Sequence, residues 1–363
     1  MTRAAVLRSH EAPFSIEEVT LDAPRAGEVL VEIVATGLCH TDLLLRAETM
    51  ATRLGPTVLG HEGAGVVREV GPGVTRVRAG DHVLLSFDSC GWCRSCLRGA
   101  PAYCTEFGVR NMSGRRPDGS VGARDRNGAE VANRWFGQSS FAELSLATER
   151  NLVVVDPSLP LELLGPLGCG LQTGAGSVLN EMRLAAGQSI AVFGAGAVGL
   201  AAVMAARIAG ASDIVVVDLH DSRLETALDL GATRVVRGGT DDVAGQVRGS
   251  GSGVDFSFET TAVGSVISTA VEVLDVPGKA VLVGAGPGEL RMSPTLLVGR
   301  TVTFALEGGS VPQLLLPELI AHWQAGRFPF ERLVTTYPLD EIDRAEADSA
   351  AGSTIKPVIS CAA

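Results

Sequence analysis

The stretch Ser-Ile-Ala-Val-Phe-Gly-Ala-Gly-Ala-Val-Gly at residues 189–199 decides the fold of the central part of the chain. Its first five residues read as a buried strand, and a Gly-x-Gly-x-x-Gly turn follows at once. An alanine-rich helix is expected over 200–209, then a second strand over 213–217 with Asp218 at its end. Strand, glycine turn, helix, strand and terminal acid in this order predict a dinucleotide-binding βαβ unit.

Each residue of the turn has a separate expected role. Gly194 allows the tight turn, Gly196 lets the backbone approach the pyrophosphate, and Gly199 lets helix and strand pack closely. Ala197 and Val198 stand at the helix N-terminus, whose free N–H groups favour phosphate. Asp218 can bind both adenosine ribose hydroxyls and would repel the extra phosphate of NADP, so NAD is favoured. Arg223 leaves NADP open, because a nearby guanidinium could serve a phosphate.

The alternation of strands and helices continues after this unit. Strands are expected over 232–236, 255–258 and 279–283, with a helix over 263–274 between the last two. Such alternation predicts a parallel sheet covered on both faces. We expect the turn that begins at Val283 and Gly284 to lie beside the nicotinamide. A further helix is expected over 314–325, and the tail is expected to return to the first domain.

The N-terminal part of the chain has a different character. Short β-branched runs at 2–7, 29–35 and 65–70 alternate with glycine and proline turns, which predicts a barrel or partly open sandwich. Residues 108–134 are rich in Gly, Arg, Asp and Asn and are expected to form an exposed irregular loop. The aromatic segment 135–141 is expected in the core or in the substrate cleft.

Four of the seven cysteines are closely spaced in a lobe at residues 90–104. The spacing is C-x2-C-x2-C-x7-C, and four thiolates so close together need a cation. A closed four-cysteine zinc site satisfies them and leaves no position for substrate, so its role is structural. An iron–sulfur cluster is the alternative. The members are Cys90, Cys93, Cys96 and Cys104.

Two other cysteines and a histidine lie in three separate glycine-flanked segments. Cys39 lies in the segment 37–42, His61 and Glu62 follow Gly60, and Cys169 lies between two glycines. A lone cysteine is usually a small buried apolar residue. Two cysteines and one histidine with an open fourth position, however, are a known pattern for catalytic zinc.

Length and composition set the remaining bounds. At 363 residues the chain is expected to form two domains. The 30 basic and 41 acidic residues give a net charge of −11 without a basic stripe, which argues against a nucleic-acid partner. We expect no signal peptide, and the uncharged run 190–206 contains three glycines and is too short to favour a membrane span. A cytoplasmic protein is expected.

With these motifs together, the chain resembles the zinc-dependent medium-chain alcohol dehydrogenases along nearly its whole length. The resemblance implies an α/β fold: a β-rich GroES-like catalytic domain of residues 1–170 and 307–363, and a Rossmann doubly wound parallel sheet over 171–306. It also implies two zinc ions per subunit, NAD, a small alcohol or aldehyde substrate, and a homodimer or homotetramer.

Carried over by position, the resemblance implies roles for individual residues. Cys39, His61 and Cys169 would bind the catalytic zinc, with Glu62 beside it as a transient ligand. Asp42 would orient His61, and Thr41 would take the alcohol proton. Other residues would contact the cofactor: the pyrophosphate would meet His40 and Lys356, and the nicotinamide would lie near Thr173.

One position departs from the family. Many members carry a histidine five residues after the first cysteine ligand, whereas this chain has Leu44, so the proton needs another exit. Leu44 and the segment 135–141 look most like the enzymes for aryl and allylic alcohols. The alternatives are a same-fold dehydrogenase for thiol-adduct formaldehyde or polyols, an NADPH-dependent enal or quinone reductase, and a non-enzymatic zinc- and nucleotide-binding protein.

Overall fold

The computed structural model describes residues 1–44 and 54–361, which form two compact units. The first unit comprises Met1–Cys169, Val311–Pro317 and Glu331–Ala363, and the second comprises Gly170–Ser310 and Glu318–Phe330. Residues 307–310 and 318–330, which we expected with the N-terminal domain, therefore cluster with the second unit. The long helix α11 (Pro312–Gln324) belongs partly to each unit.

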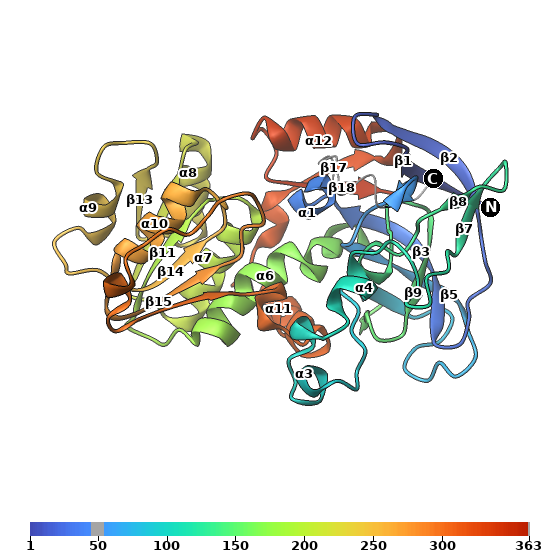
Figure 1. Ribbon diagram of the computed structural model, residues 1–363, viewed down its shortest axis with the longest axis horizontal. Coiled ribbons are helices and arrows are strands. Elements are labelled where there is room, and N and C mark those ends of the chain that lie inside the picture. The colour runs from blue at the N-terminus through green and yellow to red at the C-terminus, as the bar shows by residue number, and fades with distance from the viewer. Residues whose placement is uncertain (45–53, 362–363) are drawn as a thin grey trace. The chain divides into compact units, whose positions relative to one another are not determined.

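The second unit is built on a six-stranded parallel sheet in the order β13-β12-β11-β14-β15-β16. This confirms the predicted doubly wound sheet. Figure 1 labels β13, β11, β14 and β15 of this sheet. The chain reverses its direction across the sheet between β11 and β14, where ligands of such folds bind. The strands are β11 (Ser189–Phe193), β12 (Asp213–Asp218), β13 (Arg234–Arg237), β14 (Val254–Glu259), β15 (Leu274–Leu282) and β16 (Arg300–Phe304).

Hydrophobic residues explain why this sheet is covered by helices. Residues 190–193 of β11 are at most 1% exposed, as expected for a strand buried on both faces. In α7, residues 199–206 are all buried, so this helix is apolar all round and lies in the core. It ends at Gly210, whose positive φ of 83° forms the C-cap. The helices of this unit are α6 (Gly170–Gly176), α7 (Ala197–Ala209), α8 (Asp221–Leu230), α9 (Val243–Arg248) and α10 (Gly264–Glu272).

The first unit contains two mainly antiparallel sheets. One has the order β4-β1-β2-β7-β8; the other has the order β10-β6-β5-β3-β18-β17, with β9 also paired to β3. The C-terminal strand pairs with β3, so the tail joins the N-terminal residues as predicted. The strands are β1 (Thr2–Leu7), β2 (Phe14–Leu21), β3 (Glu28–Gly37), β4 (Thr57–Val58), β5 (Gly63–Val70), β6 (His82–Leu85), β7 (Ala123–Asp125), β8 (Glu130–Val131), β9 (Leu144–Thr148), β10 (Leu152–Val155), β17 (Val334–Pro338) and β18 (Lys356–Ser360).

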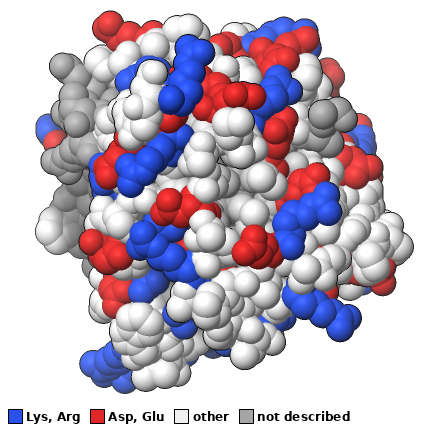
Figure 2. All heavy atoms as spheres, turned by 90° about the vertical axis from the view of Figure 1, so that its right-hand side faces the viewer, with Lys and Arg blue, Asp and Glu red and all other residues white. Residues whose placement is uncertain are grey.

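Short helices connect these strands. None of the helices in the described ranges 1–44 and 54–361 has the length and apolar character that crossing a bilayer requires. On the face shown in Figure 2, acidic and basic side chains are interspersed. The short helices are α1 (His40–Leu43), α3 (Arg94–Leu97), α4 (Phe107–Asn111), α5 (Leu161–Leu164) and α12 (Ile342–Ala350).

The prediction of an exposed irregular loop over 108–134 is wrong in its main part. The segment contributes β7 and β8, and Arg116 in it is only 4% exposed. Arg116 is buried because Glu28 accepts hydrogen bonds from its Nε at 2.7 Å and its Nη2 at 3.0 Å. Composition alone could not show this, because the partner lies 88 residues away in sequence.

Candidate metal centres and dinucleotide site

Four possible metal ligands from three separate segments meet in the first unit. The ligand atoms of Cys39, His61, Glu62 and Cys169 all lie within 4.8 Å of one another. His61 and Glu62 are fully buried and Cys169 is 7% exposed. Nε2 of His61 lies 3.2 Å from Sγ of Cys169. Two thiols and an imidazole converging in this way fit a catalytic zinc ion.

Glycines allow these segments to approach one another. At Gly37, a Cβ atom would lie 1.8 Å from Oε2 of Glu62, so a side chain would displace that carboxylate. Gly60, directly before His61, has a φ of +87°, and a Cβ atom there would lie 2.6 Å from the backbone nitrogen of Phe141. Glycine is therefore required at these two positions beside the expected ligands, because any larger residue would collide with a neighbouring segment.

Asp42 lies against His61, as the resemblance implied. Its Oδ1 atom is 2.7 Å from Nδ1 of His61. When Nδ1–H donates to this carboxylate, Nε2 presents its lone pair toward the two cysteines, which is the tautomer a metal requires. Hydrogen bonding to Cys169 is the main reason why the pKa of the Cys39 thiol lies well below its usual value. The arrangement thus favours a thiolate at Cys39. Burial alone would lower the pKa of His61, but the charge of Asp42 and its hydrogen bond outweigh burial and raise that pKa well above its usual value.

Lys356 is buried beside Glu62. Its Nζ atom lies 2.5 Å from Oε2 of Glu62 and donates to the carbonyl oxygen of Leu38 at 3.2 Å. Burial raises the pKa of Glu62 to about 7, and the positive charge of Lys356 opposes this shift. His40, in contrast, is exposed at the start of α1. The expected contacts of His40 and Lys356 with a pyrophosphate stay predictions.

The four-cysteine lobe fits a second metal ion. All four cysteines are free, and their sulfur atoms lie within 4.8 Å of one another. Sulfur–sulfur distances include 3.5 Å for Cys93 and Cys96, 3.9 Å for Cys90 and Cys96, and 4.0 Å for Cys93 and Cys104. A tetrahedral zinc site with Zn–S bonds of about 2.3 Å needs separations of about 3.8 Å.

In the second unit, the glycine turn joins β11 to α7. Gly194 has a φ of +97°, and a Cβ atom on Gly199 would lie 1.8 Å from the carbonyl oxygen of Gly194. At Gly196 a Cβ atom would meet nothing within 4 Å. Two of the glycines are therefore needed by the fold itself, whereas the space beside Gly196 is open to a ligand.

Asp218 lies at the end of β12 beside this turn. Its carboxylate accepts hydrogen bonds from the backbone nitrogens of Ala195 at 2.7 Å and His220 at 2.8 Å. Arg223 follows in α8, and its Nε atom is buried without a hydrogen-bond partner in the described part of the chain. The turn, the acid and the guanidinium thus belong to neighbouring segments of one unit.

The remaining expected cofactor residues also lie in the second unit. Thr173 is half-buried in α6. Val283 directly follows β15 and donates its backbone N–H to Glu259 at 2.9 Å, at the end of β14. Gly284 comes next, where a Cβ atom would lie 2.5 Å from the backbone nitrogen of Ala262. Their contacts with a nicotinamide stay predictions.

Sequence reasoning missed two aromatic contacts at the metal-ligand cluster. The ring of Phe136 stacks on the imidazole of His61, with ring centres 4.4 Å apart and planes at 28°. Nε1 of Trp135 donates to Oδ1 of Asp42 at 3.0 Å. The aromatic pair was visible in the sequence, but its partners lie more than 70 residues away and no local pattern reveals them.

Comparisons with known proteins agree with this fold and site. Residues 25–157 match the family model for the alcohol dehydrogenase GroES-like domain, and residues 197–319 match that for zinc-binding dehydrogenases. Together with the geometry, these matches define a zinc-binding dehydrogenase of two domains.

Individual relatives narrow the class. Geraniol dehydrogenase of Castellaniella defragrans is 41% identical over 98% of this chain and 97% of its own. The crystal structure of benzyl alcohol dehydrogenase from Acinetobacter calcoaceticus has a TM-score of 0.95 and 41% identity, covering 99% of both chains. An alcohol dehydrogenase zinc-binding domain protein from Burkholderia ambifaria has a TM-score of 0.95 and 48% identity, covering 100% of this chain and 99% of that one. The chain belongs to the zinc-dependent medium-chain alcohol dehydrogenase family.

Proposed function

We propose that the protein is a zinc-dependent, NAD-linked dehydrogenase that reversibly oxidises a primary alcohol, aromatic or allylic, to its aldehyde. The observation that carries this proposal is the convergence of Cys39, His61 and Cys169, with Glu62 beside them, in a buried cluster of metal ligands. A zinc ion bound there would act as a Lewis acid that acidifies the substrate hydroxyl. NAD would accept the hydride.

The side chains around this cluster have distinct proposed roles. Thr41 follows Cys39 by two residues in α1 and would accept the hydroxyl proton of the alcohol. Asp42 would keep His61 in the required tautomer. Because Leu44 stands where many relatives have a histidine, the proton would leave Thr41 through water or another base.

Aromatic side chains beside the metal ligands support an unsaturated substrate. Phe136 stacks on His61, and the ring of Phe107 meets the ring of Phe136 edge-on at 6.1 Å. Such rings favour planar, polarisable groups over small aliphatic ones. The names of the two similar enzymes, for benzyl alcohol and geraniol, point to the same substrate class.

The cofactor preference rests on the end of β12. The carboxylate of Asp218 would bind the ribose hydroxyls of NAD and repel the 2′-phosphate of NADP. Arg223 in α8 argues for NADP, because a nearby guanidinium could bind that phosphate. We also propose that the protein is located in the cytoplasm and that it assembles into a homodimer or homotetramer.

A substrate and cofactor panel tests the proposal. The purified protein should contain two zinc ions per chain and reduce NAD much faster than NADP with benzyl alcohol or geraniol, and ethanol should be a poor substrate. A strong preference for a polyol or a thiol adduct of formaldehyde would contradict the substrate class. NADPH-linked reduction of an enal that survives removal of zinc would contradict the whole proposal.

The role of Thr41 can be tested separately. Thr41→Val keeps the branched shape but removes the hydroxyl, so kcat should fall by about 10²–10⁴, the usual contribution of a proton-transfer group. Thr41→Ser retains the hydroxyl and is the matched control. Equal kcat values for the valine and serine variants would show that another group takes the proton.

A further inference from the structure

The indole of Trp135 is fully buried and directed at the carboxylate behind the metal ligands. Its Nε1–H donates to Oδ1 of Asp42 at 3.0 Å, and the side chain is 0% exposed. A buried indole N–H needs a partner, but here the partner is the residue that orients His61. We infer that Trp135 is a positioning residue of the proposed catalytic metal centre, acting through Asp42 on His61.

Asp42 accepts hydrogen bonds from three separate segments of the chain. Oδ1 is bonded to Nδ1 of His61 at 2.7 Å, the backbone nitrogen of Gly60 at 3.1 Å and Nε1 of Trp135, while Oδ2 accepts from the backbone nitrogen of Cys39 at 3.1 Å. A carboxylate offers about four acceptor sites. With four donors in place, the carboxylate cannot rotate without breaking a hydrogen bond in a buried site.

Trp135 differs from the other three donors. Those donors belong to the segments that carry Cys39 and His61, so they move together with the ligands. Trp135 lies 93 residues after Asp42 in sequence and reaches it from the short 3₁₀ turn Trp135–Gly137. It therefore supplies an external anchor for both ligand segments.

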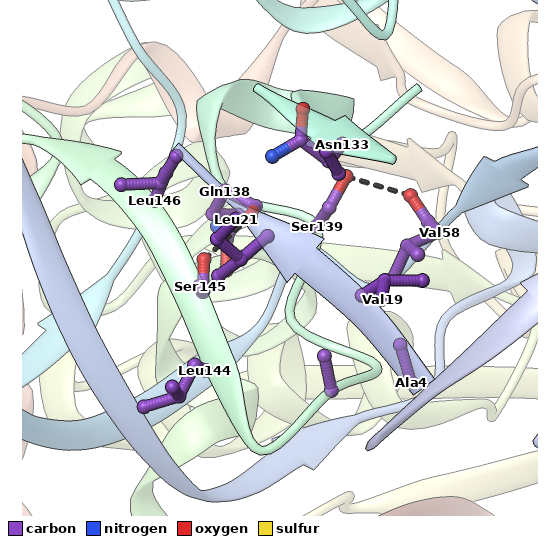
Figure 3. Close-up of a pocket in the computed structure, with 12 residues that line it drawn as sticks. Ala4, Val19, Leu21, Val58, Asn133, Gln138, Ser139, Leu144, Ser145 and Leu146 are labelled. Atoms are coloured by element: carbon purple, nitrogen blue, oxygen red, sulfur yellow. Dashed lines mark hydrogen bonds between the residues drawn. The ribbon is translucent and has the colours of Figure 1, made fainter. Parts of the chain in front are cut away.

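The turn that carries Trp135 is itself held firmly. The hydroxyl of Ser139 accepts from the backbone nitrogen of Trp135 at 2.8 Å. The same hydroxyl donates to the carbonyl oxygen of Val58 at 2.6 Å (Figure 3). Ser139 and Val58 line a cavity of only about 10 Å³, so the packing around them leaves little room for movement. Phe136 and Ser139 have positive φ angles of 50° and 56°, a conformation that persists only when its surroundings fix it.

The neighbouring residue acts on the same imidazole from another side. Phe136 stacks on the face of His61, while Trp135 acts on its edge through Asp42. Contact with the face limits tilting of the ring, and the hydrogen bond at Nδ1 limits its rotation. Two adjacent residues thus restrict two motions of one expected ligand.

This inference rests on the proposed catalytic metal centre, and zinc release tests it without measuring turnover. Trp135→Phe keeps an aromatic ring but removes the N–H. We expect zinc to leave the Cys39–His61–Cys169 centre about 10-fold faster, the lower end of the loss in metal affinity when an outer partner of a ligand is removed. Release from the four-cysteine lobe should not change, which provides an internal control.

The experiment uses the full-length zinc-loaded protein, a chromogenic chelator and four chains: wild type, Trp135→Phe, Asp42→Ala and the double variant. If Trp135 acts through Asp42, the effect of Trp135→Phe on the release rate should disappear in the Asp42→Ala background. Trp323→Phe, in the other unit, is the matched control for loss of an indole. Site-specific replacement of Trp135 by benzothienylalanine, which has sulfur in place of N–H, gives a second variant with unchanged ring shape.

The possible outcomes separate the inference from the proposed function. A wild-type chain that binds only one zinc ion would overturn both. Two zinc ions in the wild type and unchanged release from Trp135→Phe or from the benzothienylalanine chain would overturn the inference alone. An acceleration of the same size with and without Asp42 would also overturn it, because Trp135 would then act by packing. Faster release from this centre only, dependent on Asp42, would support it.

Discussion

A single methyl group at Gly196 should separate cofactor binding from folding. The backbone at Gly196 has φ −78° and ψ −175°, which alanine adopts freely, and a Cβ atom there would meet nothing within 4 Å. Gly196→Ala should therefore leave the fold intact, and should stabilise it by about 0.4–1 kcal/mol because the unfolded chain loses freedom. If the pyrophosphate lies against this residue, the methyl group should cost about 1–3 kcal/mol of overlap. The Kd for NAD would then rise about 5- to 150-fold.

Gly199 provides the opposite control in the same turn. Alanine at this helical position would gain about 1 kcal/mol in helix propensity. Its Cβ atom would, however, lie 1.8 Å from the carbonyl oxygen of Gly194, a backbone atom that cannot move alone. Overpacking costs about 1–3 kcal/mol and sometimes more, so Gly199→Ala should destabilise the fold.

Urea unfolding and calorimetric titration with NAD measure the two effects on the same preparations. The expected pattern is a raised or unchanged unfolding midpoint with weak NAD binding for Gly196→Ala, and a lowered midpoint for Gly199→Ala. Undiminished NAD binding by Gly196→Ala would refute the placement of the pyrophosphate. A midpoint for Gly196→Ala as low as that for Gly199→Ala would refute the steric argument.

Three further predictions concern the metal centres and the buried ion pair. Cys39→Ser should abolish turnover and leave the fold, whereas Cys96→Ser should chiefly lower the melting temperature; equal melting temperatures for Cys96→Ser and wild type would reject a structural role for the lobe. Complete removal of zinc by a chelator should abolish alcohol oxidation, and activity should return on adding zinc; activity that persists would contradict the metal centre. Arg116→Leu should cost about 3–5 kcal/mol at pH 7 in urea unfolding, because Glu28 would stay buried without the two hydrogen bonds that Arg116 donates to it; a loss below 1 kcal/mol would contradict this.

The pH dependence of the last variant follows from the pKa of Glu28. Burial alone would raise this pKa, but hydrogen bonds from Arg116 and the charge of Arg134 hold it below the ordinary value. In the unfolded chain a glutamate has a pKa of about 4.3. Because the pKa of Glu28 is lower in the folded protein, ionised Glu28 stabilises the fold at pH values above about 4.3. This stabilisation is lost as the pH falls through the lower pKa of the folded state. Without Arg116 the pKa of Glu28 in the folded protein should rise above its value in the unfolded chain. Lowering the pH should then make the contribution of Glu28 to the stability of the variant more favourable, instead of less favourable as in the wild type. The stability gap between the variant and the wild type should thus narrow from pH 7 to pH 4.

The sequence predicted the second unit well because its patterns are local. A buried strand such as β11 is an uninterrupted apolar run, and the glycine turn follows it directly. β16 was missed, since its residues are mostly half-exposed and show no clear alternation. In the first unit, β7 and β8 were missed because Arg116 and its neighbours look like surface residues until Glu28 is placed beside them.

In the candidate site, too, the features with a local sequence pattern were predicted and those that depend on distant residues were not. Cysteine spacing and glycine flanks were enough to predict which residues gather, since metal ligands must be residues of particular types. The sequence could not show what holds them. The role of Asp42 was implied only by the family resemblance. Trp135 and Phe136 act through contacts between segments about 75–95 residues apart, and aromatic residues are common in an ordinary core.

The groups that hold the ligands explain why the cluster can be ordered without depending on a metal ion alone. A loop that positioned Cys39 and His61 only through the metal would lose its structure whenever the metal left. Here the backbone nitrogens of Cys39 and Gly60 are already bonded to one carboxylate, and Trp135 holds that carboxylate from a separate turn. The chain therefore loses conformational entropy at these segments when it folds, so a zinc ion would bind a preorganised site. A preorganised site would fix the position at which a substrate oxygen can approach the metal. A dehydrogenase needs this, because it must hold the reacting atoms in a defined orientation.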